Sequence, residues 1–320
     1  MRLPAHGHHR PRRTLVSPSR ATLWCSLIAS ASVIAGPARP SVAAASHGHV
    51  AALDTSRIEQ LTGVRGKLDR AASVFKVSAP RSDLALIVGG VKLTPPSGLT
   101  SWAAFEPAGS GVMVMGDMVL TEDQVNPVMS VALDNGLDVT ALHNHFLGES
   151  PRVMFMHVGG QGSIESLAAA VGKVFARIKE PGVPLPNADI DPAKSQLDTD
   201  RIATALGHRG DLAGGVYKVT IGRSARMHGH AIGSAMGVNT WAAFSGTNDD
   251  AVVDGDVAMI EAELQPVLRA LRHADIQIVA IHQHMTGEAP RIMFLHYWGV
   301  GRAEDLARGL RSALDQTSSR

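Results

Sequence analysis

The chain has 320 residues and a formal net charge of +1. Residues 1–45 hold six arginines and no acidic residue, so the remainder carries 24 basic against 29 acidic side chains, a net charge of −5. That balance argues against a nucleic-acid partner, which needs a basic face. The 275 residues after position 45 are enough for two domains of ordinary size.

The N-terminal segment has the pattern of an export signal. Its arginines surround an apolar stretch, Thr22–Gly36, that is too short for a stable membrane anchor. Ala43 and Ala45 satisfy the small-x-small rule, so we expect cleavage near Ala45 and a periplasmic or secreted protein. Cys25, the only cysteine, lies in the apolar stretch. A metal in the mature chain would therefore be held by imidazole and carboxylate groups.

The rest of the chain is a tandem duplication. Residues 141–162 (ALHNHFLGESPRVMFMHVGGQG) align without gaps with residues 280–301 (AIHQHMTGEAPRIMFLHYWGVG), and 12 of the 22 positions are identical. The same offset of 139 aligns two WAAF segments that begin at Trp102 and Trp241. We predict a signal peptide at 1–45, a first repeat domain at 53–180, a proline-rich linker at 181–197 and a second repeat domain at 198–317.

Periodicity predicts the same elements in both repeats. In the first repeat they are, in chain order, a helix near 56–61, strands at 73–79, 85–89, 100–105 and 112–120, a helix from 121 to 135, strands at 139–146 and 152–158, and a helix at 163–178. Thr121 and Gln124 fit a capping box at the start of the second helix. Trp102 and Phe155 alternate with small or polar residues and are interpreted as core.

This order of elements predicts an α+β fold. Each repeat is expected to form a mainly antiparallel sheet with helices packed on one face. Two such sheets can pack face to face, or they can extend one another about a pseudo-two-fold axis.

A cluster of histidines marks the hairpin of each repeat. His143 and His145 lie two apart on a predicted strand, which places both imidazoles on one face. Glu149 follows in the turn, and His157 lies on the returning strand. Strand register decides whether His157 joins the pair, because a shift of one residue turns it to the other face. The second repeat has the same set: His282, His284, Glu288 and His296.

Three imidazoles and a carboxylate are ligands that zinc and related transition metals prefer. We therefore expect each repeat to bind a transition metal, zinc first. Glu149 and Glu288 would be a fourth ligand or the general base of a metal-dependent hydrolase of the cell envelope. Asp117 and Asp256 either orient a ligand imidazole or are turn residues that follow a glycine. A metal-free acid–base site and histidines that brace the turn are the alternatives.

Arg152 and Arg291 follow a proline at matching positions. A guanidinium there can grip an anionic ligand through its bidentate fork. The interpretation that we favour is a salt bridge to Glu149 or Glu288 that fixes the turn, because a glutamate and an arginine three residues apart can meet directly. The first reading leads to an alternative function, a metal-free binding module for a cell-envelope glycan or another anionic ligand.

The hairpin ALHNH…ESPRVMFMHVGGQG, its second copy and the two WAAF segments resemble the LppY/LpqO family of exported bacterial proteins. The resemblance covers nearly all of the chain after the signal, and it implies export and a duplicated domain. The family is named for lipoproteins, but Trp24 precedes Cys25 and is too large for a lipoprotein cleavage site. Lipid anchoring is therefore not implied for this chain, and the resemblance implies no particular reaction.

Overall fold

A computed structural model describes residues 53–318 of the chain. The predicted signal peptide at 1–45 lies outside these residues. Within them, no helix is both long and apolar enough to cross a membrane.

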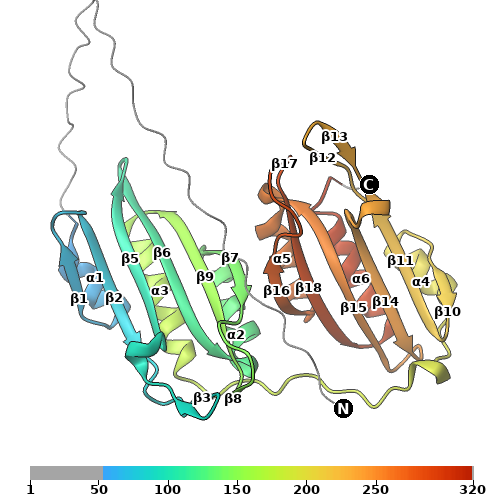
Figure 1. Cartoon of the computed structure of the whole chain (residues 1–320), viewed down its shortest axis with the longest axis horizontal. Coiled ribbons are helices and arrows are strands. Elements are labelled where there is room, and N and C mark those ends of the chain that lie inside the picture. Colours follow the sequence, from blue (N-terminus) through green and yellow to red (C-terminus); the bar gives the residue numbers. More distant parts are fainter. Residues whose placement is uncertain (1–52, 319–320) are drawn as a thin grey trace, which may run out of the picture. The chain divides into compact units, whose positions relative to one another are not determined.

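The first repeat contains three α-helices and nine strands (Figure 1). Its elements are α1 Thr55–Thr62, β1 Gly66–Asp69, β2 Val74–Pro80, β3 Ile87–Val88, β4 Val91–Lys92, η1 Pro95–Ser97, β5 Thr100–Ala108, β6 Gly111–Thr121, α2 Glu122–Asp134, β7 Asp138–His143, β8 Glu149–Ser150, β9 Val153–Gly162 and α3 Ile164–Ile178.

The second repeat follows a linker that contains the short helix η2, Pro192–Lys194. Its elements are α4 Thr199–Leu206, β10 Asp211–Ala213, β11 Val216–Gly222, β12 Ala225–Met227, β13 His230–Ile232, η3 Ser234–Met236, β14 Asn239–Gly246, β15 Ala251–Ile260, η4 Glu261–Glu263, α5 Leu264–His273, β16 Gln277–His282, β17 Glu288–Ala289, β18 Ile292–Gly301 and α6 Ala303–Leu314.

The predicted α+β class is confirmed, and the main sheet is antiparallel throughout. Its twelve strands have the order β1-β2-β5-β6-β9-β7-β16-β18-β15-β14-β11-β10. The repeats join where β7 pairs with β16, with Leu142 opposite Ile281. The two sheets therefore extend one another, and the face-to-face alternative is wrong.

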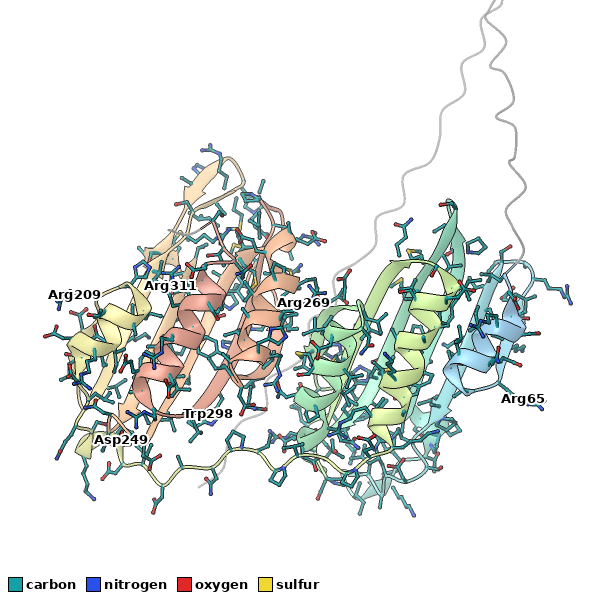
Figure 2. All side chains as sticks on the ribbon, turned by 180° about the vertical axis from the view of Figure 1, so that it is seen from behind. Arg65, Arg209, Asp249, Arg269, Trp298 and Arg311 are labelled. Carbon is teal, nitrogen blue, oxygen red and sulfur yellow. The ribbon has the colours of Figure 1, made fainter. Side chains whose placement is uncertain are left out.

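All six α-helices cover one face of this sheet. They lie behind the strands in Figure 1 and in front of them in Figure 2, which shows the molecule from behind. Helix α2 starts where the sequence predicts, and the backbone N–H of Thr121 donates to Gln124 Oε1 at 3.2 Å. One apolar core lies between sheet and helices and includes residues of both repeats, among them Leu142 and Ile281.

The other face of the sheet carries two small additional sheets, one in each repeat. Strands β4, β3 and β8 form the first, and β13, β12 and β17 form the second. Each covers a small apolar cluster, which contains Phe155 in the first repeat and Phe294 in the second. Phe155 is therefore core, as predicted, but the same prediction for Trp102 is wrong: its ring is half-buried and lies under Lys76. The histidine hairpins run beside these clusters, so the candidate site lies on the face that the helices leave uncovered.

Candidate metal centre

Strand pairing brings His143 and His157 together. His157 lies between Met156 and Val158, whose side chains are in the main core, so its own side chain points to the helix-free face. It pairs with Ala141, after a register shift that follows Val139. The Nε2 atoms of His143 and His157 are 3.1 Å apart.

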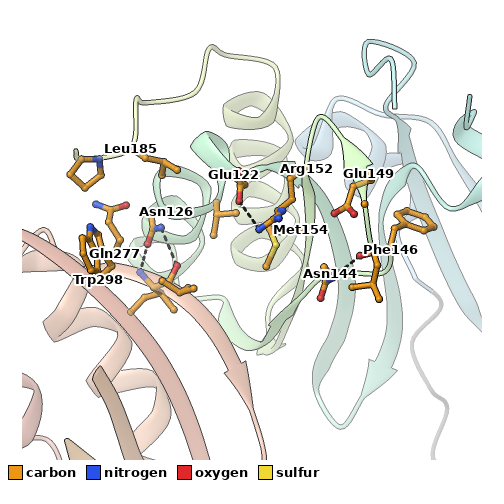
Figure 3. Close-up of a pocket in the computed structure, with 16 residues that line it drawn as sticks. Glu122, Asn126, Asn144, Phe146, Glu149, Arg152, Met154, Leu185, Gln277 and Trp298 are labelled. Atoms are coloured by element: carbon orange, nitrogen blue, oxygen red, sulfur yellow. Dashed lines mark hydrogen bonds and ion pairs between the residues drawn. The ribbon is translucent and has the colours of Figure 1, made fainter. Parts of the chain in front are cut away.

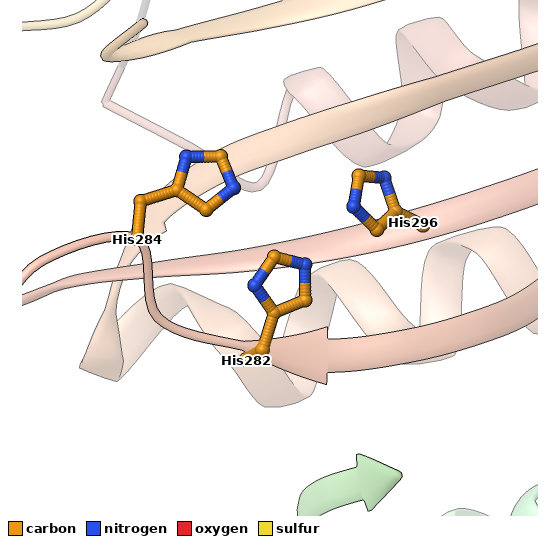
Figure 4. Close-up of side chains that lie close together, drawn as sticks. All are labelled: His282, His284 and His296. Atoms are coloured by element: carbon orange, nitrogen blue, oxygen red, sulfur yellow. The ribbon is translucent and has the colours of Figure 1, made fainter. Parts of the chain in front are cut away.

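The second repeat gathers His282, His284 and His296. One ring nitrogen of each lies within 4.8 Å of the other two, a spacing that allows all three to reach one metal ion (Figure 4). The ring centroids of His282 are 5.0 Å from His284 and 4.8 Å from His296. In the first repeat the corresponding distances are 5.2 Å and 5.1 Å. The ring spacings are therefore similar in the two repeats, but among residues 53–318 only the second triad brings one nitrogen from each of its three rings this close together.

His145 and His284 reach this arrangement from outside the strands. Strand β7 ends at His143, three residues earlier than predicted, and His145 lies in the turn that follows. Its ring stacks on Phe155, with centroids 3.4 Å apart and planes 4° apart. His284 stacks on Phe294 in the same way, at 3.5 Å and 11°. Stacking on the buried phenylalanine of the returning strand, and not a position within a strand, therefore fixes the orientation of these two imidazoles.

Backbone carbonyls lie near the Nδ1 atom of three of the rings. His143 Nδ1 is 3.3 Å from the oxygen of Asn144, and His296 Nδ1 is 3.3 Å from that of Gly255. His282 Nδ1 is 3.5 Å from the oxygen of Gln283, at the limit for a hydrogen bond. A proton on Nδ1 that donates to a carbonyl leaves the lone pair of Nε2 free, which is the tautomer of a metal ligand.

An aspartate lies next to each set of histidines, half-buried in the first repeat (Asp117) and buried in the second (Asp256). Asp117 pairs with His157 across β6 and β9, and Asp256 pairs with His296 across β15 and β18. Both aspartates lie inside strands, so their reading as turn residues is wrong. Asp256 is 2% exposed, and its Oδ2 is 3.5 Å from His284 Nε2. The Oδ1 atoms of both aspartates are buried and have no hydrogen-bond partner among the described residues.

Burial sets the ionisation of these groups. It raises the pKa of Asp256 to about 6, although the charge of His296 lowers it in part. Burial also raises the pKa of Asp117, against the charges of His157, His145 and His143. The pKa values of three imidazoles are lowered, first by burial; these are His145, His282 and His284. Neutral imidazoles with available lone pairs are what a metal requires.

The two predicted glutamates lie at the edge of this arrangement. Glu149 is in β8 and its Oε1 is buried without a hydrogen-bond partner among the described residues. Glu288 is in β17, and its Oε1 accepts the backbone N–H of Ile292 at 3.0 Å. Glu288 is not among the atoms grouped around the second triad.

The predicted arginines lie further out. Arg152 is 64% exposed in its side chain, and its guanidinium is 3.6 Å from Glu122 Oε1, so its ion-pair partner in the structure is Glu122 and not Glu149. Arg291 is exposed. The structure does not bring either arginine into the histidine cluster.

A cavity of about 510 Å³ lies beside the first hairpin (Figure 3). Arg152, Glu149 and Phe146 line it from the first repeat, and Gln277 and Trp298 line it from the second. The composition of the hairpin alone could not reveal this cavity, because part of its wall comes from the linker and the other repeat.

Sequence comparison assigns the chain to a family. The family model described as Domain of Unknown Function (DUF1259) matches residues 56–177 and 200–316. The chain belongs to the DUF1259 family. Each matched segment contains one complete hairpin, so the duplication seen in the sequence is two DUF1259 domains in tandem. No curated protein and no solved structure matches the chain.

Proposed function

We propose that each DUF1259 repeat binds one transition metal ion, zinc first, through its three histidines. These are His143, His145 and His157, and His282, His284 and His296. The observation that carries the proposal is the second triad, whose three ring nitrogens lie within 4.8 Å of one another. In a tetrahedral zinc site with Zn–N bonds of about 2.05 Å, two ligand nitrogens are roughly 3.3 Å apart. The Nε2 atoms of His143 and His157, at 3.1 Å, already approach that spacing.

A buried, unpartnered carboxylate oxygen in each repeat supports a cation over a purely structural role for the histidines. A histidine that only braces a turn does not explain why a carboxylate oxygen is buried beside it without a partner. Such an atom in a native protein costs about 1–3 kcal/mol. Asp117 and Asp256 both carry one, each next to a histidine of its own repeat. A metal would offset this cost by its charge.

Three imidazoles leave a coordination position open, where a metal polarises a substrate or a water molecule. We therefore propose a hydrolase of the cell envelope as the reaction class, with Glu149 and Glu288 as general bases. Asp117 and Asp256 are the carboxylates nearest to the rings and are the second candidates for that role. Export through residues 1–45 is part of the proposal, and the resemblance to the LppY/LpqO family supports it.

The metal content of the untagged protein tests the proposal. We expect about two equivalents of zinc per chain, and about one when the three histidines of either hairpin are replaced by alanine. His273→Ala is the matched control, because this histidine is exposed and lies beside Asp134, away from both hairpins. Metal content that is unchanged in both triple variants contradicts the proposal.

The cavity supports a second candidate, the metal-free binding module. Its wall combines Arg152 and Glu149 with Phe146 and Trp298, which is a mixture suited to a polar organic ligand. On this account cell-wall material binds in the presence of a chelator and fails to bind Arg152→Ala. If the chelator abolishes the binding of cell-wall material, the result instead supports the metal site.

A further inference from the structure

The two histidine sites face the same side of one sheet. Leu142 and Ile281 are paired across β7 and β16, and both side chains are in the core under the helices. The next residue on each strand points the other way. His143 and His282 therefore both project from the helix-free face, at the centre of the twelve-stranded sheet.

The register also gives the distance between the sites. His157 pairs with Ala141, and His296 pairs with Ala280. When the β7–β16 register is continued by one residue each way, Ala141 faces His282 and Ala280 faces His143. The four strands β9, β7, β16 and β18 are consecutive in the sheet. The centres of the two sites are thus two strand spacings apart, roughly 10 Å, with two small alanines between them.

Two amide side chains, Asn126 (buried) and Gln265 (half-buried), hold this junction. Asn126 of α2 accepts the backbone N–H of Ile278 at 2.7 Å and donates to its carbonyl at 3.1 Å. Gln265 of α5 does the same to Val139, at 3.0 Å and 2.9 Å. Asn126 and Gln265 are equivalent residues at the offset of 139, and so are Val139 and Ile278. The junction is therefore a reciprocal, pseudo-two-fold contact that fixes both hairpins relative to each other.

This spacing favours one long ligand over a shared pair of metals. Two metals that share a bridging ligand lie about 3.5–4 Å apart, which the register does not allow. A lysine flanks each site on the same face: Lys76 Nζ is 3.9 Å from the ring centroid of Trp102, and Lys218 Nζ is 4.3 Å from that of Trp241. Trp102 pairs with Asp117, and Trp241 pairs with Asp256. Bound metals and these lysines make the face suited to anionic groups.

We propose that the two sites form one composite surface for an extended anionic ligand, which coordinates one metal in each repeat through two oxygen-bearing groups roughly 10 Å apart. Neighbouring charged units of an anionic polymer have this chemistry. The inference rests on the proposed metal sites and adds that they act together. A ligand that engages both binds with a gain of about 10²–10⁴ over one that engages either alone.

Phosphonates of defined length test the inference by calorimetry on the zinc-loaded protein. Hexanediphosphonate can span the two sites, methylenediphosphonate is too short, and butylphosphonate has one coordinating group. We expect one hexanediphosphonate per chain, bound at least ~10² times more tightly than butylphosphonate, of which two bind. In the variants His157→Ala and His296→Ala, each with one zinc site lost, the advantage of hexanediphosphonate should fall to about twofold or less. His273→Ala should retain it.

Three results overturn the inference. Two hexanediphosphonates per chain, bound no more tightly than butylphosphonate, show independent sites. If methylenediphosphonate gains as much affinity over butylphosphonate as hexanediphosphonate does, the gain comes from chelation of a single metal. A protein that takes up no zinc contradicts the proposed function as well, and metal content, measured first, separates this failure from the other two.

Discussion

Asp256 shows how one residue couples the fold to the site. It lies in β15 beneath the second triad, is almost fully buried, and places Oδ2 3.5 Å from His284 Nε2. In the proposed metal site, a carboxylate in that position would either coordinate the metal or orient an imidazole that does. Glu288 is the carboxylate that the sequence suggests for the site, but one of its oxygens accepts a hydrogen bond from the backbone N–H of Ile292.

This difference predicts unequal effects of two isosteric changes. In a chain that lacks the first triad, Asp256→Asn should weaken zinc binding about 10–100-fold, because it removes a negative charge that supports the ligands. Glu288→Gln should leave zinc affinity unchanged, and it tests the general-base role separately through activity. Competition with a chromophoric chelator measures both affinities. Equal losses in the two variants, or none in Asp256→Asn, contradict the role given to Asp256.

At the scale of elements, sequence patterns predict the helices and hairpins that form through interactions between neighbouring residues. Helix α2 follows from its capping box and amphipathic spacing, and the hairpin of β7 and β9 from its apolar alternation. Strands β1 and β10 have only four and three residues, too few to give a pattern. His145 and His284 depend on stacking against Phe155 and Phe294, which no spacing rule predicts. The β7–β16 pairing joins segments 139 residues apart, so the sequence left both sheet arrangements open.

In both repeats an arginine that follows a strand of the main sheet, Arg81 after β2 and Arg223 after β11, bonds to a residue at the start of a helix. In the first, Arg81 donates to Gln124 Oε1 at 3.1 Å and pairs with Asp83 at 2.8 Å. In the second, Arg223 pairs directly with Glu263 at 2.7 Å, and both side chains are about nine-tenths buried. The carboxylate that pairs with the arginine is thus Asp83, in the following loop, in the first repeat, and Glu263, at the start of a helix, in the second.

Glu263 makes stability depend on pH. Burial raises its pKa, but hydrogen bonds from Ser318 and Ile260 and the charge of Arg223 outweigh burial, so the pKa is lowered from 4.5. A lowered folded-state pKa stabilises the protein fully above the unfolded value, and this stability is lost as pH falls through the folded value.

We therefore expect Glu263→Gln to reduce the free energy of unfolding at neutral pH by about 3 kcal/mol, because a buried ion pair loses one charge. The variant should also lose less stability than the wild type when pH falls below about 4.5. Urea unfolding across this pH range measures both effects, with the exposed Glu261→Gln as control. If Glu263→Gln and Glu261→Gln have the same unfolding free energies, the buried pair does not stabilise the fold.

At the scale of the whole molecule, duplication places the two hairpins side by side in one sheet. The apolar core beneath the helices is shared by both repeats, which explains why the sheets extend one another. Had they packed face to face, the histidines would have been buried between them. Side-by-side joining leaves both sites on a common open face, where a single ligand can reach them.

Anomalous diffraction at the zinc edge, from crystals of the zinc-loaded protein, tests the central claim most directly. The account predicts two peaks on the helix-free face, each about 2.0–2.1 Å from ring nitrogens of the three histidines of one repeat. The peaks should be roughly 10 Å apart. Peaks absent from both triads, with zinc held instead at exposed histidines such as His228 or His230, would contradict it.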